Sequence, residues 1–204
     1  MTVPMGAIYG FTGENGSGKS TLMNILGCLD IPTYGDYHLD GVDVTERTDT
    51  QLAHIRNKQI GFIFQGYNLI PALNVWENVE LPRLYQGVMG SRRRELGEHA
   101  LERVNLLDRA KHKPTEMSGG QQQRAAIARA IATCPPIIMA DEPTGALDSR
   151  TGHEVLEFLQ QLNREGTTVI LITHDNGIAA TARRVVRLTD GKIVEDREQE
   201  VDWF

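Results

Sequence analysis

Four short runs of apolar residues mark the chain, and each is flanked by glycine, proline or polar residues. The runs cover residues 7–12 (AIYGFT), 60–64 (IGFIF), 137–140 (IIMA) and 168–173 (TVILIT). They are too short for core helices and lack the polar alternation of a half-solvated strand, so each predicts a strand buried on both faces. Such strands form a parallel sheet that is covered by helices on both sides.

Helical patterns separate these strands. Apolar residues at helical spacing predict helices over residues 20–28 and 149–165, and a run rich in Ala, Arg and Gln predicts another over 122–133. Hairpins are predicted over 37–44 and 185–194, because each stretch turns through an Asp-Gly pair. Strands that alternate with helices in this way predict an α/β fold with a mostly parallel sheet.

The segment 67–117 has no apolar run of the strand type. Helices are predicted there over residues 74–81 and 92–107, the first of them ended by a proline. We therefore expect a single domain that consists of an α/β core (1–66 and 118–204) and an inserted helical subdomain (67–117).

Composition and charge narrow the range of functions. The chain has 204 residues and a formal net charge of −6, which argues against a dedicated nucleic-acid binder, since such proteins usually carry a basic surface. No apolar run is long enough to cross a bilayer, and the first residues have no pattern of a signal peptide. If the protein works at a membrane, we expect another polypeptide to provide the membrane span.

A glycine-rich segment follows the first predicted strand and precedes a predicted helix. It fits the pattern G-x-x-x-x-G-K-[ST], in which backbone N–H groups cradle phosphates, the lysine reaches the β/γ oxygens and the serine hydroxyl binds Mg²⁺. A plain glycine turn is the alternative, which the Lys-Ser pair in this context disfavours. The predicted phosphate-binding residues are Gly13, Glu14, Asn15, Gly16, Ser17, Gly18, Lys19, Ser20 and Thr21.

An acidic pair, Asp141 and Glu142, follows the predicted strand 137–140. The carboxyl edge of a parallel sheet is where α/β proteins bind ligands, so Asp141 is placed to hold Mg²⁺ and Glu142 to deprotonate an attacking water. Taken alone, a solvated acidic turn before Pro143 would be an equally good interpretation. The phosphate-binding motif upstream favours the functional one.

A second glycine pair opens the predicted helix that follows residue 117. Ser118 is a good helix N-cap, and the glycines leave the N–H groups and the positive dipole end free to face an anion. A plain capped helix is the alternative interpretation. The predicted anion-binding residues of this segment are Ser118, Gly119, Gly120 and Gln121.

These motifs, in this order, resemble those of ATP-binding-cassette (ABC) ATPases. The resemblance implies a P-loop NTPase core of RecA-like type with an inserted helical subdomain. It assigns Gln65 to Mg²⁺ and water, Asp148 in the loop GALD to the dimer interface, and His174 to the γ-phosphate. It also implies ATP and Mg²⁺ as cofactors and a head-to-tail homodimer, in which residues 118–121 of one copy cap the ATP of the other.

Longer stretches narrow the resemblance to the macrolide-exporter and lipoprotein-release branch. They include LMNILGCLDIPTYG, IGFIFQGYNLIPALNVWENVELP and ADEPTGALDSRTG. The branch implies an ATPase bound to the cytoplasmic face of the membrane, driving a separate transmembrane permease whose helix docks near the Gln65 loop and the helical subdomain. The apolar residues of this loop-like stretch, Tyr67, Leu69, Ile70 and Leu73, are expected either to line the groove for that helix or to belong to the core. A regulatory ABC ATPase that moves no substrate, and a non-transport ABC ATPase, remain alternatives.

The chain departs from the family pattern in a few places. Members carry about two strands and an adenine-stacking aromatic residue before the P-loop, and no equivalent stretch precedes Gly13. Because a base–aromatic stack is worth about 1–3 kcal/mol, we expect ATP and GTP to bind with similar, weak affinity. Arg83 stands where the branch is usually apolar, and the acidic tail 195–202 is predicted to be solvated, with Trp203 available for packing or for a partner.

Overall fold

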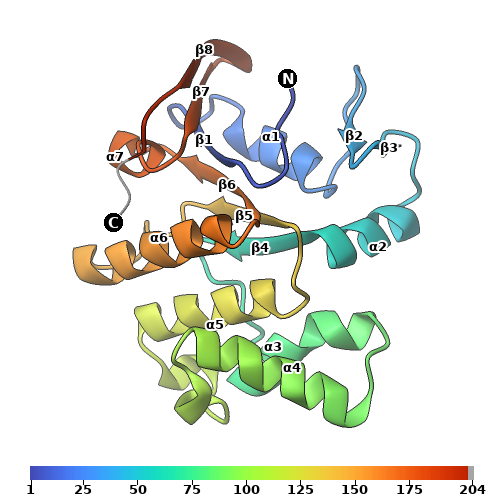
Figure 1. Ribbon diagram of the computed structural model, residues 1–204, viewed down its shortest axis with the longest axis vertical. Coiled ribbons are helices and arrows are strands. Elements are labelled where there is room, and N and C mark those ends of the chain that lie inside the picture. Colours follow the sequence, from blue (N-terminus) through green and yellow to red (C-terminus); the bar gives the residue numbers. More distant parts are fainter. Residues whose placement is uncertain (202–204) are drawn as a thin grey trace.

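A computed structural model describes residues 1–201 as an α/β domain with a six-stranded sheet (Figure 1). The strand order is β4-β5-β6-β1-β7-β8, and every pairing is parallel except that of β7 with β8. All four apolar runs form strands, which confirms the prediction. The bounds are β1 Ile8–Thr12, β4 Ile60–Phe64, β5 Ile137–Asp141, β6 Thr168–Thr173, β7 Arg184–Thr189 and β8 Lys192–Glu198.

Alternate residues of the central strands serve two separate cores. Tyr9 of β1 and Met139 of β5 pack on one face with α1 (Lys19–Leu26) and α2 (Asp49–Gln59). Their neighbours in sequence, such as Ile138 in β5, pack on the other face. That second core runs without interruption through α5 (Gly119–Ile131) and α6 (Ser149–Arg164) into the helical part of the chain. Successive side chains of a strand point to opposite faces, so a strand that lies between two cores must be apolar at every position.

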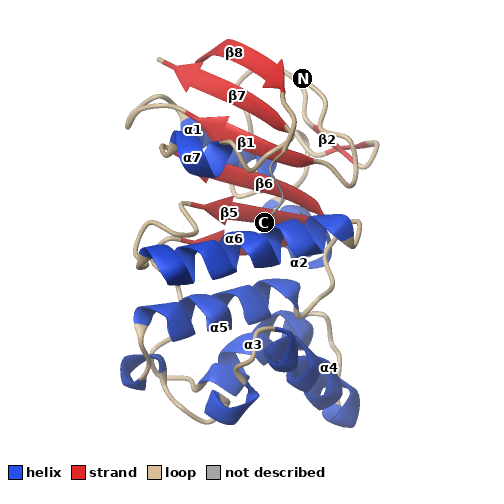
Figure 2. Ribbon diagram, turned by 60° about the vertical axis from the view of Figure 1, so that its left-hand side comes forward, coloured by secondary structure: helices blue, strands red, loops and turns tan. Residues whose placement is uncertain are grey.

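The helical part forms a separate layer beyond α5 (Figure 2). It contains α3 (Val75–Tyr85), α4 (Gly90–Arg103) and two short 3-10 turns, Leu107–Arg109 and Pro114–Glu116. Two predicted boundaries were wrong. The first helix continues through Pro82 to Tyr85, where the Pro82 carbonyl accepts hydrogen bonds from the Gln86 N–H and the Asn57 side chain.

The second wrong boundary is the end of the helix expected over 92–107. It stops at Arg103, because Asn105 turns into the left-handed region at φ 51° and cannot continue an α-helix. Arg83 has a structural reason for its place at a usually apolar position: its Nε donates a hydrogen bond to the Ala132 carbonyl at 2.6 Å.

Two helices were not predicted, α2 and the short α7 (Asn176–Ala179), whereas the hairpin over 37–44 is present as β2 (His38–Leu39) and β3 (Val42–Asp43). The tail is solvated from Glu195 to Glu198, as predicted, but the strand there was not predicted. That stretch pairs with β7 as β8, although its side chains stay exposed. Trp203 and the end of the predicted tail lie outside the described residues. Among residues 1–201, no helix is long and apolar enough to cross a membrane.

Candidate functional site

The P-loop joins β1 to α1 at the carboxyl edge of the sheet. Gly13 has φ 155°, and a Cβ there would lie 2.3 Å from the Leu188 carbonyl oxygen, so no side chain fits. Gly18 caps α1 with a left-handed φ of 99°. The Lys19 ammonium lies across the loop and donates to the carbonyls of Gly13 (2.7 Å) and Glu14 (2.8 Å). The loop therefore depends on glycines at positive φ, as the backbone of a phosphate cradle requires.

The turn between β7 and β8 braces this loop, a contact that the sequence did not predict. The Gly191 N–H donates to the Ser17 carbonyl at 3.0 Å, and a Cβ added to Gly18 would lie 3.4 Å from the Gly191 backbone. The Ser17 hydroxyl is buried without a hydrogen-bond partner. The β7–β8 hairpin therefore holds the P-loop in place through these backbone contacts.

Asp141 and Glu142 lie at the carboxyl edge of the sheet, as the sequence predicted, and Asp141 is close enough to Lys19 of the P-loop to feel its charge. Asp141 ends β5 in register with Phe64 of β4 and Ile172 of β6. Burial raises the pKa of the Asp141 carboxyl, and the negative charge of Glu142 raises it further, while the Lys19 ammonium opposes both. A half-buried carboxylate that depends on nearby positive charge fits a role in binding a cation.

The Glu142 carboxylate is held by three hydrogen-bonding groups at the end of β6. Its Oε2 accepts from the Thr173 hydroxyl at 3.0 Å, and its Oε1 accepts from the His174 N–H at 2.8 Å. The same Oε1 lies 2.6 Å from His174 Nδ1. The side chain of Glu142 is 14% exposed and that of His174 is 62% exposed. The structure therefore brings these two predicted residues into direct contact.

Gln65 and the loop after Glu142 also meet. A Cβ on Gly145 would lie 2.8 Å from Gln65 Nε2, so the glycine leaves space for this amide. Asp148 is the N-cap of α6, and its Oδ1 accepts from the Thr151 N–H at 3.0 Å while its Oδ2 accepts from the Thr151 hydroxyl at 2.7 Å. These bonds lower the pKa of the Asp148 carboxyl.

The second glycine pair opens α5 in the predicted way. Ser118 caps the helix and forms a reciprocal capping box with Gln121, whose backbone N–H donates to the Ser118 hydroxyl. A Cβ on Gly119 would lie 2.8 Å from the Tyr67 hydroxyl, and one on Gly120 would lie 2.7 Å from the Thr151 methyl group. Within one chain, this helix start therefore contacts the Gln65 loop and α6 rather than the P-loop.

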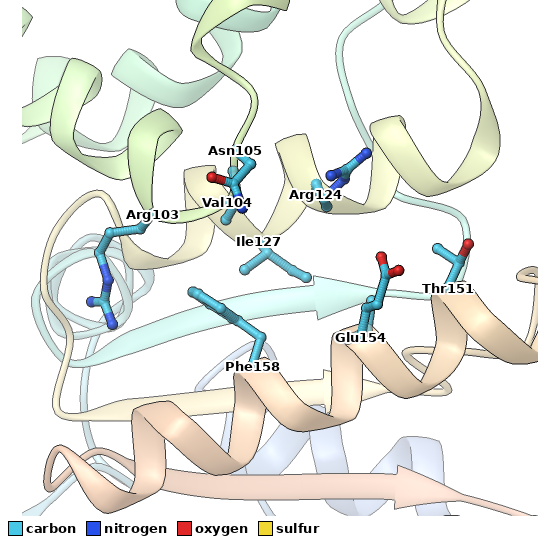
Figure 3. A pocket seen from close by; sticks show the side chains of 9 residues that line it. Arg103, Val104, Asn105, Arg124, Ile127, Thr151, Glu154 and Phe158 are labelled. Carbon is cyan, nitrogen blue, oxygen red and sulfur yellow. The ribbon is translucent and has the colours of Figure 1, made fainter. Parts of the chain in front are cut away.

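Three cavities lie around these elements. The first, of about 370 Å³, opens beside the P-loop and includes His174. Its lining adds Thr12, Asn176 and Arg187, which no sequence motif had indicated. The second, of about 190 Å³, separates the end of α4 from α6, with the Arg103 guanidinium over the ring of Phe158 (Figure 3). It contains none of the predicted site residues.

The third is a broad, mostly apolar groove of about 760 Å³ between α2, β4 and α3. Its exposed apolar residues include Leu29, Ile70 and Tyr85. Leu69 is partly buried and packs against the core, which is the alternative that the sequence left open for this residue. Tyr67 also turns inward, toward Gly119, because the backbone is left-handed at Tyr67 and Asn68.

A P-loop after β1 of a parallel sheet, with an acidic pair at the end of β5 on the far side of β6, defines a P-loop nucleotide-binding protein. The sequence profile described as "ABC transporter" matches residues 1–145. The chain belongs to this family, as an ATP-binding subunit and an ABC ATPase.

Relatives and solved structures agree with this assignment. The chain is 50% identical over 194 residues to the "Uncharacterized ABC transporter ATP-binding protein YknY" of Bacillus subtilis (strain 168), covering 95% of this chain and 84% of that protein. It is also 50% identical over 197 residues to the "Macrolide export ATP-binding/permease protein MacB" of Burkholderia thailandensis, covering 97% of this chain but only 30% of MacB.

The solved ATP-binding cassette MJ0796, a dimer bound to ADP and Pi in a post-hydrolysis state, matches with a TM-score of 0.90 and 44% identity. The match covers 97% of this chain and 88% of that one. The fold is therefore the ABC cassette fold, with a mostly parallel sheet and a helical subdomain. The likeness to MacB places the chain near the MacB-type exporters.

Proposed function

We propose that this chain hydrolyses ATP at the interface of a homodimer and thereby drives a separate permease in export. The observation that carries the proposal is the fixed Glu142 carboxylate. It follows Asp141 and is bound to the end of β6, at the sheet edge where a bound γ-phosphate would meet water. The similarity to an export ATP-binding/permease protein supports the direction of transport.

Each predicted residue has a role in this proposal. Backbone N–H groups of residues 13–21 bind the phosphates, and Lys19 exchanges its contacts to loop carbonyls for phosphate oxygens. Ser20, Gln65 and Asp141 hold Mg²⁺, which neutralises charge on the phosphates when it is bound. The ion would be held partly by the phosphates of the substrate.

Glu142 acts as the general base in this proposal. Hydrogen bonds from Thr173 and His174 orient its carboxylate and leave lone pairs for a water molecule. His174 is the more exposed partner, so it can leave Glu142 and contact the γ-phosphate of bound ATP. The pair therefore links the presence of ATP to the freedom of the base.

The second copy completes the site. The start of α5 exposes Ser118 beside Gly119 and Gly120, and its free N–H groups suit the γ-phosphate of a facing copy. Asp148 would lie at the same interface. The solved dimeric form of MJ0796 supports this arrangement.

The permease docks in the groove between α2, β4 and α3. The groove is open, has an apolar lining and includes Asn68 and Ile70 of the loop that follows Gln65. An exposed apolar surface of this kind is typical of an interaction site. Docking there would hold the chain on the cytoplasmic face of the membrane.

Glu142→Gln tests the chemistry. The amide cannot take a proton from water, so turnover should fall roughly 10²-fold or more while ATP binding is kept. Single-turnover hydrolysis and equilibrium nucleotide binding are measured on the same preparation.

Lys19→Ala is the matched comparison for this experiment. It should weaken nucleotide binding itself, because it removes a charge-assisted phosphate contact. Turnover of Glu142→Gln at the rate of the unmodified protein would remove Glu142 from the role of base and contradict the proposal.

A further inference from the structure

The loop after Gln65 contains a strained backbone turn. Tyr67 and Asn68 have consecutive left-handed φ values of 60° and 51°. Residues other than glycine adopt this region at a cost, and two in succession persist only where surrounding contacts fix them. Inside the loop, the Tyr67 N–H donates to the Phe64 carbonyl at 3.0 Å and the Asn68 N–H donates to the Gly66 carbonyl at 2.6 Å.

Arg129 of α5 supplies the contact from outside the loop. Its Nη1 donates to the Asn68 carbonyl at 2.5 Å, and its Nη2 donates to the Tyr67 carbonyl at 2.9 Å. Both carbonyls of the turn are therefore bound by one planar fork, which a lysine cannot reproduce. Burial lowers the pKa of the Arg129 guanidinium, but an arginine keeps its charge in proteins.

Helix α5 meets this turn a second time through Tyr67, whose hydroxyl lies against Gly119 at the start of the helix. On its other side the loop is attached to α3. The buried Asn78 accepts from the Ile70 N–H at 2.8 Å and donates to the Ile70 carbonyl at 3.1 Å. The turn thus lies between the groove, where Asn68 and Arg129 are lining residues, and the nucleotide site.

We propose that Arg129 is a positioning residue that locks the Tyr67–Asn68 turn to α5 and thereby sets the place of Gln65. The proposal rests on the function proposed above, in which Gln65 binds Mg²⁺ and the groove receives the permease. A permease segment that moves the turn then moves Gln65 and the start of α5 together. Without the two hydrogen bonds of Arg129, the Tyr67–Asn68 turn and α5 remain folded but no longer move together.

Arg129→Lys tests the lock, with Arg83→Lys as the matched control. Arg83 also donates to a backbone carbonyl, that of Ala132 at the C-cap of α5, but it does not contact the Gln65 loop. Amide hydrogen exchange of residues 66–70 should rise roughly tenfold in Arg129→Lys, since a charge-assisted hydrogen bond is worth about tenfold or more in an equilibrium. The free Mg²⁺ concentration at half-maximal turnover should rise as well. Arg83→Lys should change neither quantity.

Adding Asn68→Gly to Arg129→Lys separates positioning from a general loss of stability. Glycine adopts φ 51° without strain, so the double variant should recover the Mg²⁺ midpoint of the unmodified protein. If Arg129 only stabilised the fold, Arg129→Lys would lower the unfolding temperature and the active fraction but would leave the Mg²⁺ midpoint unchanged.

The proposal would be overturned if amide hydrogen exchange of residues 66–70 were unchanged in Arg129→Lys. It would also be overturned if adding Asn68→Gly did not restore the Mg²⁺ midpoint. Gln65→Ala keeps this test distinct from the proposed function. If Gln65→Ala leaves the Mg²⁺ midpoint unchanged, the assignment of Gln65 to the ion fails. The exchange measurement then still decides whether Arg129 locks the turn.

Discussion

Glu142 combines a strained backbone with a side chain that is held by hydrogen bonds. Its φ of 45° is left-handed, which costs a residue with a Cβ about 1–2 kcal/mol. The backbone N–H donates to the Ile172 carbonyl at 2.8 Å, and the carboxylate is bound by Thr173 and His174. These contacts offset the strain and turn the carboxylate toward the end of β6. A strained residue held by its surroundings is what a functional position often shows.

Asp148 is the N-cap of α6, and we also propose that it lies at the dimer interface. The pH dependence of stability tests the capping role separately. The Asp148 carboxylate caps α6 through the N–H and hydroxyl of Thr151, and these bonds lower its pKa in the folded protein. A lowered carboxyl pKa contributes stability above the unfolded-state value, and this contribution is lost as pH falls through the folded-state value.

Asp148→Ala should therefore lower the unfolding temperature at neutral pH, and the difference from the unmodified protein should narrow below about pH 4. Thermal unfolding followed by circular dichroism across pH 3–7 measures it. Asp148→Asn keeps an N-cap without a titrating group and is the control. A difference that stays constant across this range would show that the charge of Asp148 does not stabilise α6.

The predictability of the site follows from how its residues are specified. Gly13, Gly18 and Lys19 could be predicted because one short motif contains all their constraints. Arg187 could not, because it reaches the P-loop cavity only through the pairing of β7 with β1, between residues far apart in sequence.

At the scale of elements, strands were predictable and helix limits were less so. Each buried strand is a continuous apolar run, whereas α2 has little amphipathic pattern and only Leu52 fully buried. Its start did carry a signal, the capping box of Thr48 and Gln51. At Pro82, α3 accepts a hydrogen bond from the Asn57 side chain of α2, and a local rule for proline does not include such a contact between distant residues.

Groove residues between α2, β4 and α3 give a test of the permease interface. Ile70→Glu places a charge in the apolar lining, where Ile70 is 42% exposed, so the fold should tolerate it. Co-purification with the cognate permease should fall at least tenfold, because a buried unpaired charge is costly, while basal ATP hydrolysis persists. Ile193→Glu, on exposed β8 outside the groove, is the control. Equal recovery of the permease with both variants would place the interface elsewhere.

For the whole molecule, the sheet separates two packing layers with different tasks. The P-loop, Asp141 and Glu142 lie on strands and turns of the central sheet, whereas the Ser118 helix start belongs to the layer continuous with α3 and α4. Each chain therefore contains two segments that we propose to bind phosphate, and they contact different neighbours. A head-to-tail pair of chains would bring one element of each kind to every nucleotide.

Assembly gives the last prediction, made in a Glu142→Gln background that retains ATP. ATP should shift this protein from monomer toward dimer in light scattering. Adding Ser118→Asp should block the shift, because Asp is also a good N-cap but its negative charge repels the γ-phosphate of the facing copy. ATP binding by the single chain should remain.

Thr48→Asp is the matched control for this variant. Thr48 caps α2 with the same reciprocal capping box, on a helix that packs beside β4 and lines the groove, so Thr48→Asp should dimerise normally. Because both substitutions exchange one capping side chain for another, a difference in mass between them reports on the interface rather than on helix stability. Dimerisation of Ser118→Asp with unchanged affinity would mean that the start of α5 does not face the partner's ATP, and the head-to-tail arrangement would fail.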